Sequence, residues 1–314
     1  MSLTSDNPSS VIRTEGLRKS FGKIQAIKNL SLNVERGEMF GLVGPDGAGK
    51  TTVMRLLSAV LDPDAGDAWV LGRHTVKESE AVKDQIAYMS QRFGLYPDLT
   101  VIENLLFYTD IYDVPRGERE KRIRRLLSFS NLGPFQKRQA RDLSGGMKQK
   151  LGLACALVHT PKVLLLDEPT NGVDPLSRRE FWKILNGLLR EQVTIFISTS
   201  YLDEAERCHR VALLNEGELL ACGTPDEVKQ MMRGTILEVR TSNPRSALEV
   251  LRKHFPAQAA RLFGDRIHLV ADSAAKAQEQ AEKAFAEEGI KLLSVREIEP
   301  GLEDVFLSVL ASNH

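Results

Sequence analysis

An excess of charge of one sign is absent from this chain. Its 314 residues include 42 lysines and arginines and 42 aspartates and glutamates. Without a global positive field, the chain has little to hold a nucleic-acid backbone, so nucleic acid is not expected as a partner. The basic run at 121–125 is interleaved with apolar residues at helical spacing, and we interpret it as a solvated helix face.

Cysteine and long apolar stretches are also scarce. The three cysteines, Cys155, Cys208 and Cys222, lack the paired spacing of metal ligands, which favours a reducing compartment and small buried side chains. No segment approaches the roughly 20 apolar residues of a spanning helix. Residues 1–10, which we expect to form a disordered tail, lack the apolar core of a secretory signal. Any action at a membrane would therefore need a partner.

The chain does have enough apolar sequence, 42% of its residues, for one large domain and a small one. From 11 to about 234, short β-rich runs alternate with helical ones, which predicts an α/β core. The runs 39–43, 163–166 and 193–197 are continuously apolar, as expected of central strands buried on both faces. The half-polar alternation of residues 12–34 predicts antiparallel strands at an edge.

Two further regions complete the predicted organisation. Residues 86–109 and 116–132 have a mostly helical pattern, which suggests a helical subdomain at about 86–160 inserted into the α/β core. After Gly234 the pattern restarts, and residues 235–314 are expected to form a small α+β domain. Its predicted elements are strands at 236–239, 266–270 and 290–298 and helices at 244–254, 274–288 and 302–310.

A glycine-rich segment follows the strand predicted at 39–43 and precedes a predicted helix at 52–60. It fits the phosphate-loop pattern and consists of Gly44, Pro45, Asp46, Gly47, Ala48, Gly49, Lys50 and Thr51. Glycines let backbone N–H groups turn inward around a phosphate, and the helix start adds partial positive charge. We therefore expect ATP here, with Lys50 at the β- and γ-phosphates, Thr51 on Mg²⁺ and Thr52 beside them. The alternative is a structural strand-to-helix turn.

Two adjacent carboxylates, Asp167 and Glu168, end the apolar strand that begins at Val163. A carboxylate at the end of a strand beside a phosphate loop can hold Mg²⁺ through water, and the next carboxylate can polarise the attacking water. Alone, such a pair is more often a turn or a helix cap. The prediction that Asp167 binds metal and Glu168 is catalytic therefore depends on the phosphate loop.

A second helix start suited to an anion lies at 143–149. Ser144 has the character of an N-cap, and Gly145 and Gly146 open a helical run that continues to Val158. One chain therefore has two phosphate-seeking helix starts.

Taken together, these motifs resemble the nucleotide-binding subunits of ABC transporters, whose Leu-Ser-Gly-Gly signature occurs at 143–146. Segments 93–100, 174–179 and 301–307 are similar to the multidrug and daunorubicin-resistance type of export ATPase. The resemblance implies a P-loop NTPase cassette at 11–234 that hydrolyses ATP. It also implies a peripheral subunit on the cytoplasmic face of the membrane, powering export through a separate ABC-2-type permease.

The resemblance implies roles for individual residues as well. Phe21 would stack on adenine, Gln91 would sense Mg²⁺ and the γ-phosphate, and Asp174 would lie in a loop that couples two sites. Two subunits of this family sandwich ATP head to tail. Ser144, Gly145 and Gly146 would therefore contact the nucleotide of the opposite subunit. Without the resemblance, Phe21 would be interpreted as core and Gln91 as surface.

One position departs from the family pattern. After the strand at 193–197 the family has a histidine that contacts the γ-phosphate and the catalytic glutamate, but here Ser200 occupies that place. His209 lies further along and is interpreted as surface. Loss of one such contact costs about 10²–10³ in rate. The sequence therefore also allows a slow site, in a heterodimer whose partner subunit has the histidine, with a homodimer as the alternative.

Other functions fit less well. A soluble ABC protein acting on DNA or ribosomes usually has tandem cassettes or a long coiled-coil insertion, and neither is visible. A GTPase is disfavoured because no Asn-Lys-x-Asp motif follows the phosphate loop. The transported substrate is recognised by the permease, so this chain does not reveal it.

Overall fold

The computed structural model describes residues 10–91, 94–232, 234–256 and 259–312. The expected tail, apart from Ser10, lies outside these residues. The chain contacts divide the molecule into two units, Met1–Thr224 and Pro225–His314, so the division precedes the boundary expected at Gly234. Each unit is described by itself below.

The continuous apolar runs form the centre of the first unit, as predicted. Strands β3 (Met39–Val43), β7 (Val163–Asp167) and β8 (Thr194–Thr199) are buried along their whole length and pair in parallel. They belong to a six-stranded sheet of order β10-β9-β3-β8-β7-β6. Its remaining strands are β6 (Ile86–Met89), β9 (Arg210–Asn215) and β10 (Glu218–Gly223).

Strand β6 corrects one prediction. Residues 86–109 were expected to be mostly helical, but residues 86–89 form an edge strand paired in parallel with β7. Ile86, Ala87 and Met89 are buried there. Four apolar residues fit a strand or a helical turn equally well, and only the pairing with β7 decides between them.

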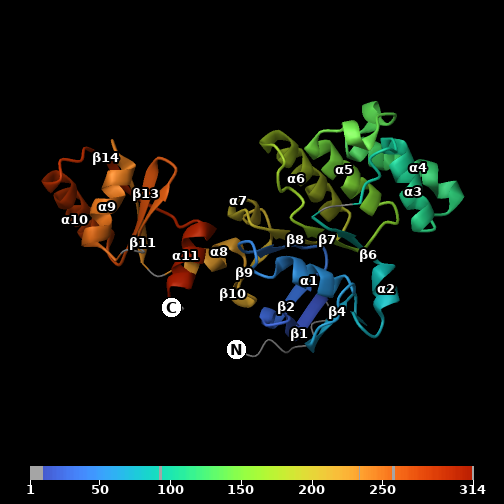
Figure 1. Cartoon of the computed structure of the whole chain (residues 1–314), viewed down its shortest axis with the longest axis horizontal. Helices are drawn as coiled ribbons and strands as arrows, with labels where there is room; N and C mark the ends of the chain where they lie inside the picture. The colour runs from blue at the N-terminus through green and yellow to red at the C-terminus, as the bar shows by residue number, and fades with distance from the viewer. Residues whose placement is uncertain (1–9, 92–93, 233, 257–258, 313–314) are drawn as a thin grey trace. The chain divides into compact units, whose positions relative to one another are not determined.

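The half-polar strands form a separate antiparallel sheet. Its order is β2-β1-β4-β5, with β1 (Ser10–Phe21), β2 (Ile24–Glu35), β4 (Ala65–Val70) and β5 (Arg73–His74). Helix α1 (Lys50–Leu57) lies between the two sheets (Figure 1), and its Val53 and Met54 share an apolar core with Leu17 and Phe40. The helix that starts at the phosphate loop is thus held from both sides.

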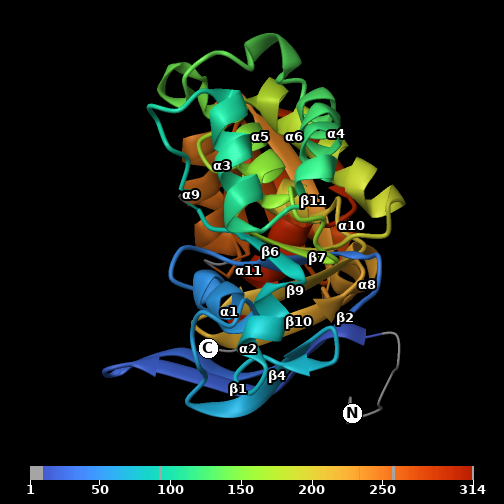
Figure 2. The ribbon, with the colours of Figure 1, turned by 90° about the vertical axis from the view of Figure 1, so that its right-hand side faces the viewer.

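The predicted helical region gathers on one side of the six-stranded sheet (Figure 2). Helix α3 starts with a capping box in which Thr100 and Glu103 bond each other's backbone N–H groups. Because β6 belongs to the sheet, the helices of this region begin only after it. They are α3 (Val101–Ile111), α4 (Arg116–Phe129) and α5 (Gly145–Ala156), followed by α6 (Pro175–Arg190). Short helices elsewhere in this unit are α2 (Ser79–Lys83) and α7 (Leu202–Ala205).

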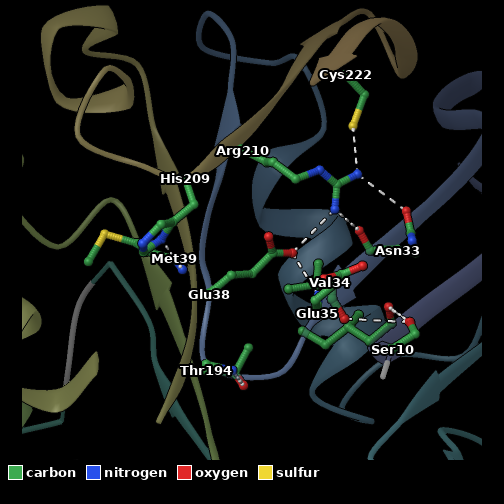
Figure 3. A network of polar contacts seen from close by, with 12 residues as sticks. Ser10, Asn33, Val34, Glu35, Glu38, Met39, Thr194, His209, Arg210 and Cys222 are labelled. Atoms are coloured by element: carbon green, nitrogen blue, oxygen red, sulfur yellow. Dashed lines mark hydrogen bonds and ion pairs between the residues drawn. The ribbon is translucent and has the colours of Figure 1, made fainter. Parts of the chain in front are cut away.

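A polar network joins the two sheets where β9 begins (Figure 3). The Arg210 guanidinium donates to the Asn33 carbonyl at 3.1 Å and to the Glu38 carboxylate at 3.3 Å. Burial raises the pKa of Glu38, and the charge of Arg210 opposes that shift. His209 is exposed, as expected, and its Nδ1 accepts the N–H of Met39 at 2.9 Å. These contacts hold together the end of β2 and the starts of β3 and β9, and β3 leads directly into the phosphate loop.

The second unit has the predicted alternation of strands and helices with one strand more. Its four-stranded antiparallel sheet has the order β12-β13-β11-β14, and α9 and α10 share an apolar core with it. The unpredicted strand is β12, a short segment that pairs with β13. The elements are α8 (Pro225–Gln230), β11 (Thr235–Thr241), α9 (Pro244–His254), β12 (Ala260–Phe263), β13 (Arg266–Ala271), α10 (Ala274–Glu287), β14 (Leu292–Ile298) and α11 (Leu302–Ser312).

In the part of the chain that the structure describes, no helix combines the length and the apolar character needed to cross a membrane.

Candidate nucleotide site

The loop between β3 and α1 depends on glycine for steric reasons. Gly49, the residue before α1, has a φ of 105°, and a Cβ there would lie 2.4 Å from the Ala26 carbonyl oxygen. A Cβ on Gly44 would lie 2.1 Å from the Leu214 carbonyl oxygen. Both distances are too short for any side chain. The loop therefore packs tightly between neighbouring strands and presents its backbone to the cavity beside it.

Lys50 lies at the centre of this loop with only 4% of its surface exposed. Its ammonium group donates to the carbonyl oxygens of Gly44 at 2.7 Å and Pro45 at 2.9 Å. It also lies 2.9 Å from Oε1 of Glu168. The loop's cation and the predicted catalytic carboxylate are thus in direct contact.

The backbone at the end of β7 directs Glu168. This residue has a φ of 47°, a left-handed conformation that costs a non-glycine residue about 1–3 kcal/mol and persists only where its surroundings impose it. Here Ser198 on β8 imposes it, because the Glu168 N–H donates to the Ser198 carbonyl at 3.1 Å and to its hydroxyl at 3.0 Å. The same hydroxyl donates to Oδ1 of Asp167 at 2.7 Å. One serine therefore orients both acidic residues.

Two amide side chains hold the other carboxylate oxygen of Glu168. Gln91 and Asn171 each donate to Oε2 at 3.2 Å. Asp167 is 1% exposed, and the Tyr88 hydroxyl lies 3.5 Å from its Oδ2. Burial, together with the charge of Asp167, raises the pKa of Tyr88 to about 12, so its phenol stays protonated at neutral pH.

Lys50, Gln91, Glu168 and Asn171 border a cavity of about 830 Å³. That volume lies within the roughly 300–1,000 Å³ typical of ligand pockets. Most of the predicted phosphate and catalytic residues therefore come together. The cavity is lined by Lys23, Ile24, Gln25, Ala26, Lys28, Asp46, Gly47, Gly49, Lys50, Thr51, Thr52, Gln91, Glu168, Asn171 and Glu216.

Several predicted residues do not line the cavity, among them Phe21, Ser200 and the predicted metal ligand Asp167. Phe21 is 48% exposed at the end of β1, where it pairs with Ile24, which does line the cavity. The Lys19 ammonium lies 5.9 Å from the centre of the Phe21 ring. Ser200 is half-buried just after β8.

The signature residues lie at the start of α5, next to the start of α6. Ser144 caps α5 and accepts the N–H of Met147 at 3.3 Å. Asp174 caps α6 and accepts the N–H groups of Leu176 and Ser177, the latter of which lowers the pKa of Asp174. A Cβ on Gly146 would lie 2.3 Å from Cβ of Ser177. Ser144, Gly145, Gly146 and Asp174 thus form one structural element outside the cavity lining.

A buried carboxylate near Ser200 was not among the residues predicted from the sequence. Glu204, 1% exposed, accepts from the hydroxyls of Thr170 and Thr199, and Arg178 lies 3.4 Å from it. Arg178 also lies over the Tyr201 ring at 4.4 Å. The segment after β8 is thereby tied to the first turns of α6. Only the acidic character of residues 203–204 was visible in the sequence, because the partners are distant along the chain.

A phosphate loop centred on a buried lysine, with two strand-end carboxylates and a cavity of nucleotide size beside it, defines the chain as a P-loop nucleotide hydrolase. Residues 27–171 match the family model described as ABC transporter. Residues 223–310 match the model of the ATP-binding protein DrrA1-3-like C-terminal domain. The chain belongs to the ABC transporter family, whose ATP-binding cassettes hydrolyse ATP.

Similar proteins cover both units. The chain is 44% identical over 305 residues to the "Probable multidrug ABC transporter ATP-binding protein YbhF" of Escherichia coli, covering 96% of this chain and 52% of that protein. It thus spans about half the length of that relative. It is 34% identical over 306 residues to the daunorubicin/doxorubicin resistance ATP-binding protein DrrA of Streptomyces peucetius, covering 96% of this chain and 93% of that protein.

Solved structures agree with this assignment. A structure of the ATP-binding subunit of an ABC transporter is 29% identical and has a TM-score of 0.64, covering 71% of this chain and 93% of that one. A dimeric cassette in a post-hydrolysis state, bound to ADP and Pi, is 27% identical with a TM-score of 0.62, covering 68% of this chain and 98% of that one.

Proposed function

We propose that this chain is the ATP-hydrolysing subunit of an ABC exporter and drives a separate ABC-2-type permease from the cytoplasmic face of the membrane. The observation that carries the proposal is the contact of Lys50 with Glu168 at the edge of a nucleotide-sized cavity. The names of similar proteins support export, since they include drug resistance, bacitracin transport and Nod factor export ATP-binding proteins.

In the proposed reaction, water attacks the γ-phosphorus of ATP and the bond to the β-phosphate oxygen breaks, releasing ADP and phosphate. Lys50 and the loop N–H groups bind the phosphates and offset their charge. When Lys50 turns to the phosphates, Oε1 of Glu168 is free to accept a proton from the water. Ser198 and the amide donors keep that carboxylate aimed at the cavity.

The donor set fits a Mg²⁺ ion that arrives with the nucleotide. The Thr51 hydroxyl, the Gln91 amide oxygen and the Asp167 carboxylate are hard oxygen ligands of the kind this ion prefers. Within the described residues, no group of three His, Cys, Asp or Glu side chains could hold a metal. The phosphates would therefore complete the coordination, and the ion would offset charge that develops on them.

The remaining site residues are assigned to a shared dimer. Phe21 would stack on adenine, and Ser144, Gly145 and Gly146 would contact the ATP held by a second cassette, with Asp174 beside them. A different cassette is the favoured partner, because Ser200 stands where the family has a histidine. A homodimer in which Glu168 alone activates water is the alternative.

Exposed apolar side chains on α3 and in the segments beside it suit a contact with the permease. Tyr96, Leu106, Ile111 and Tyr112 are between 37% and 56% exposed, an unusual density of large apolar side chains on one helix and the segment before it. Tyr96 packs edge-on against Phe107 with ring centres 4.4 Å apart. Leu95 and Pro97, which flank Tyr96, line a smaller cavity together with Gln91, so a permease bound beside Tyr96 would lie close to a side chain that contacts Glu168.

Purification of the native complex from membranes, with identification of the copurifying proteins, tests this proposal. A polytopic permease should copurify, and Ile111→Glu should weaken its recovery. Val60→Glu, a matched change at another exposed apolar residue, should not. Recovery of ribosomes or DNA in place of a permease would contradict export. Equal recovery of the permease with both variants would contradict a permease contact at α3.

A further inference from the structure

Among the described residues, three side chains contact the carboxylate of Glu168. Lys50 lies 2.9 Å from Oε1, and the amide groups of Gln91 and Asn171 each donate to Oε2 at 3.2 Å. All three partners line the cavity together with Glu168. The orientation of this carboxylate is therefore decided within the cavity itself.

Two of these partners have other tasks once nucleotide binds. Lys50 is the cation of the phosphate loop, so the phosphates compete for it. The amide of Gln91 is a ligand of the kind Mg²⁺ prefers. Asn171 has no such competing task, because it belongs to the turn after β7 and not to the phosphate loop. Its own N–H donates to the Glu168 carbonyl at 3.2 Å, which fixes the turn that carries both residues.

Ser200 does not line this cavity, although related cassettes place a histidine at that position. We propose that Asn171 is the positioning residue that holds Glu168 towards the attacking water in this chain. An amide N–H on Oε2 fixes the rotation of the carboxylate and leaves Oε1 to receive the proton. Asn171 would thereby supply the orientation that a histidine at position 200 supplies elsewhere, without its charge.

A double-mutant cycle on the full chain tests this assignment. Asn171→Ala should lower single-turnover kcat by about 10- to 100-fold, the scale of losses from misplaced catalytic groups, with KM for ATP changed less than about threefold. Ser200→His should raise kcat in the wild-type background, because it adds the charge that Asn171 does not supply, but by a smaller factor than in the Asn171→Ala background. In the Asn171→Ala background it should restore most of the loss, because the histidine then orients Glu168.

Two further measurements separate positioning from a structural effect. Asn171 is exposed, so Asn171→Ala should leave the thermal midpoint of unfolding nearly unchanged. Asn171→Asp, which matches asparagine in size but lacks the N–H donor, should be at least as slow as Asn171→Ala. ATP retained by either variant after gel filtration should rise, because bound nucleotide is hydrolysed more slowly. An unchanged kcat in Asn171→Ala, or an equal effect of Ser200→His in both backgrounds, would overturn the proposal.

Discussion

At the residue scale, the site is organised by opposite charges held in a nearly closed environment. Lys50 and Glu168 are 4% and 9% exposed. Removal of either side chain would therefore leave the charge of the other poorly compensated. The ammonium group also bonds two loop carbonyls, which keeps it at the mouth of the phosphate loop. The same position lets it meet the phosphates of a bound nucleotide.

Replacement of Lys50 by alanine should abolish tight ATP binding. The loop would lose its side-chain cation, and charge-assisted hydrogen bonds are worth about 1.5–3 kcal/mol each, or roughly 10- to 150-fold in affinity. Nucleotide titration of the purified chain measures the effect. Lys83→Ala, which removes an exposed lysine paired with Glu80, is the matched control. Wild-type affinity in Lys50→Ala would show that residues 44–51 are not the phosphate site.

At the scale of elements, the start of α5 is pressed against the start of α6. The signature glycine Gly146 meets Ser177 there, and Asp174 caps α6 one turn earlier. The two helix starts must therefore move together. We expect a shift at the start of α6, which follows Glu168 in the chain, to reach the start of α5 through this contact.

Gly146→Ala should destabilise the chain, whereas Gly145→Ala should not. A Cβ at Gly146 would lie 2.3 Å from Cβ of Ser177, while a Cβ at Gly145 meets nothing within 4 Å. Overpacking of this kind costs about 1–3 kcal/mol. For a unit of this size, each kcal/mol lost lowers the thermal midpoint of unfolding by roughly 2–4 °C. Thermal unfolding of the two variants compares them directly. Equal midpoints would mean that α5 and α6 are not in contact as described.

At the scale of the whole molecule, all residues of the nucleotide cavity belong to the first unit. The second unit has its own core between a sheet and two helices. Helix α8 packs against α11 within that unit, so a cut at Gly234 would separate α8 from its partner. A chain that ends at Thr224 is the better test of the division of labour.

We expect the chain truncated after Thr224 to bind ATP with an affinity within about threefold of the full chain, because no cavity residue is lost. Assembly with the second cassette or the permease should be impaired instead. Nucleotide titration and size-exclusion chromatography of the complex measure the two effects separately. A folded truncated chain that fails to bind ATP would contradict this division.

The proposed asymmetric dimer makes a prediction for the purified complex. Ser144→Arg should nearly abolish ATPase activity, because this signature would serve the faster site on the partner cassette. Glu168→Gln should leave much of the activity, since it affects only the slower site. ATPase assays of the two variant complexes compare them. A fully active complex with this chain as its sole cassette, or a near-total loss in Glu168→Gln alone, would contradict the asymmetry.

The sequence by itself determined the parts of this protein whose geometry is local. Three such parts are the phosphate loop at 44–51, the buried strand that ends at Asp167 and the cap at Ser144. Each has a pattern formed by residues within a few positions of one another, so the pattern can be recognised in the sequence. The family resemblance carried by these motifs is confirmed by the comparisons. The apolar periodicity after Gly234 also predicted the alternation of strands and helices there.

Only the tertiary structure decided the contacts between distant segments. Residues 86–89 and 260–263 are too short for periodicity to identify them, and they become strands through pairing with β7 and β13. The buried carboxylate of Glu204 accepts hydrogen bonds from the hydroxyls of Thr170 and Thr199, which lie on other segments. Asparagine is a common residue in turns, so the sequence gives no sign of the role of Asn171. That role depends on the left-handed backbone of Glu168, which Ser198 stabilises. Such contacts arise when separate elements pack together, and no local pattern encodes that packing.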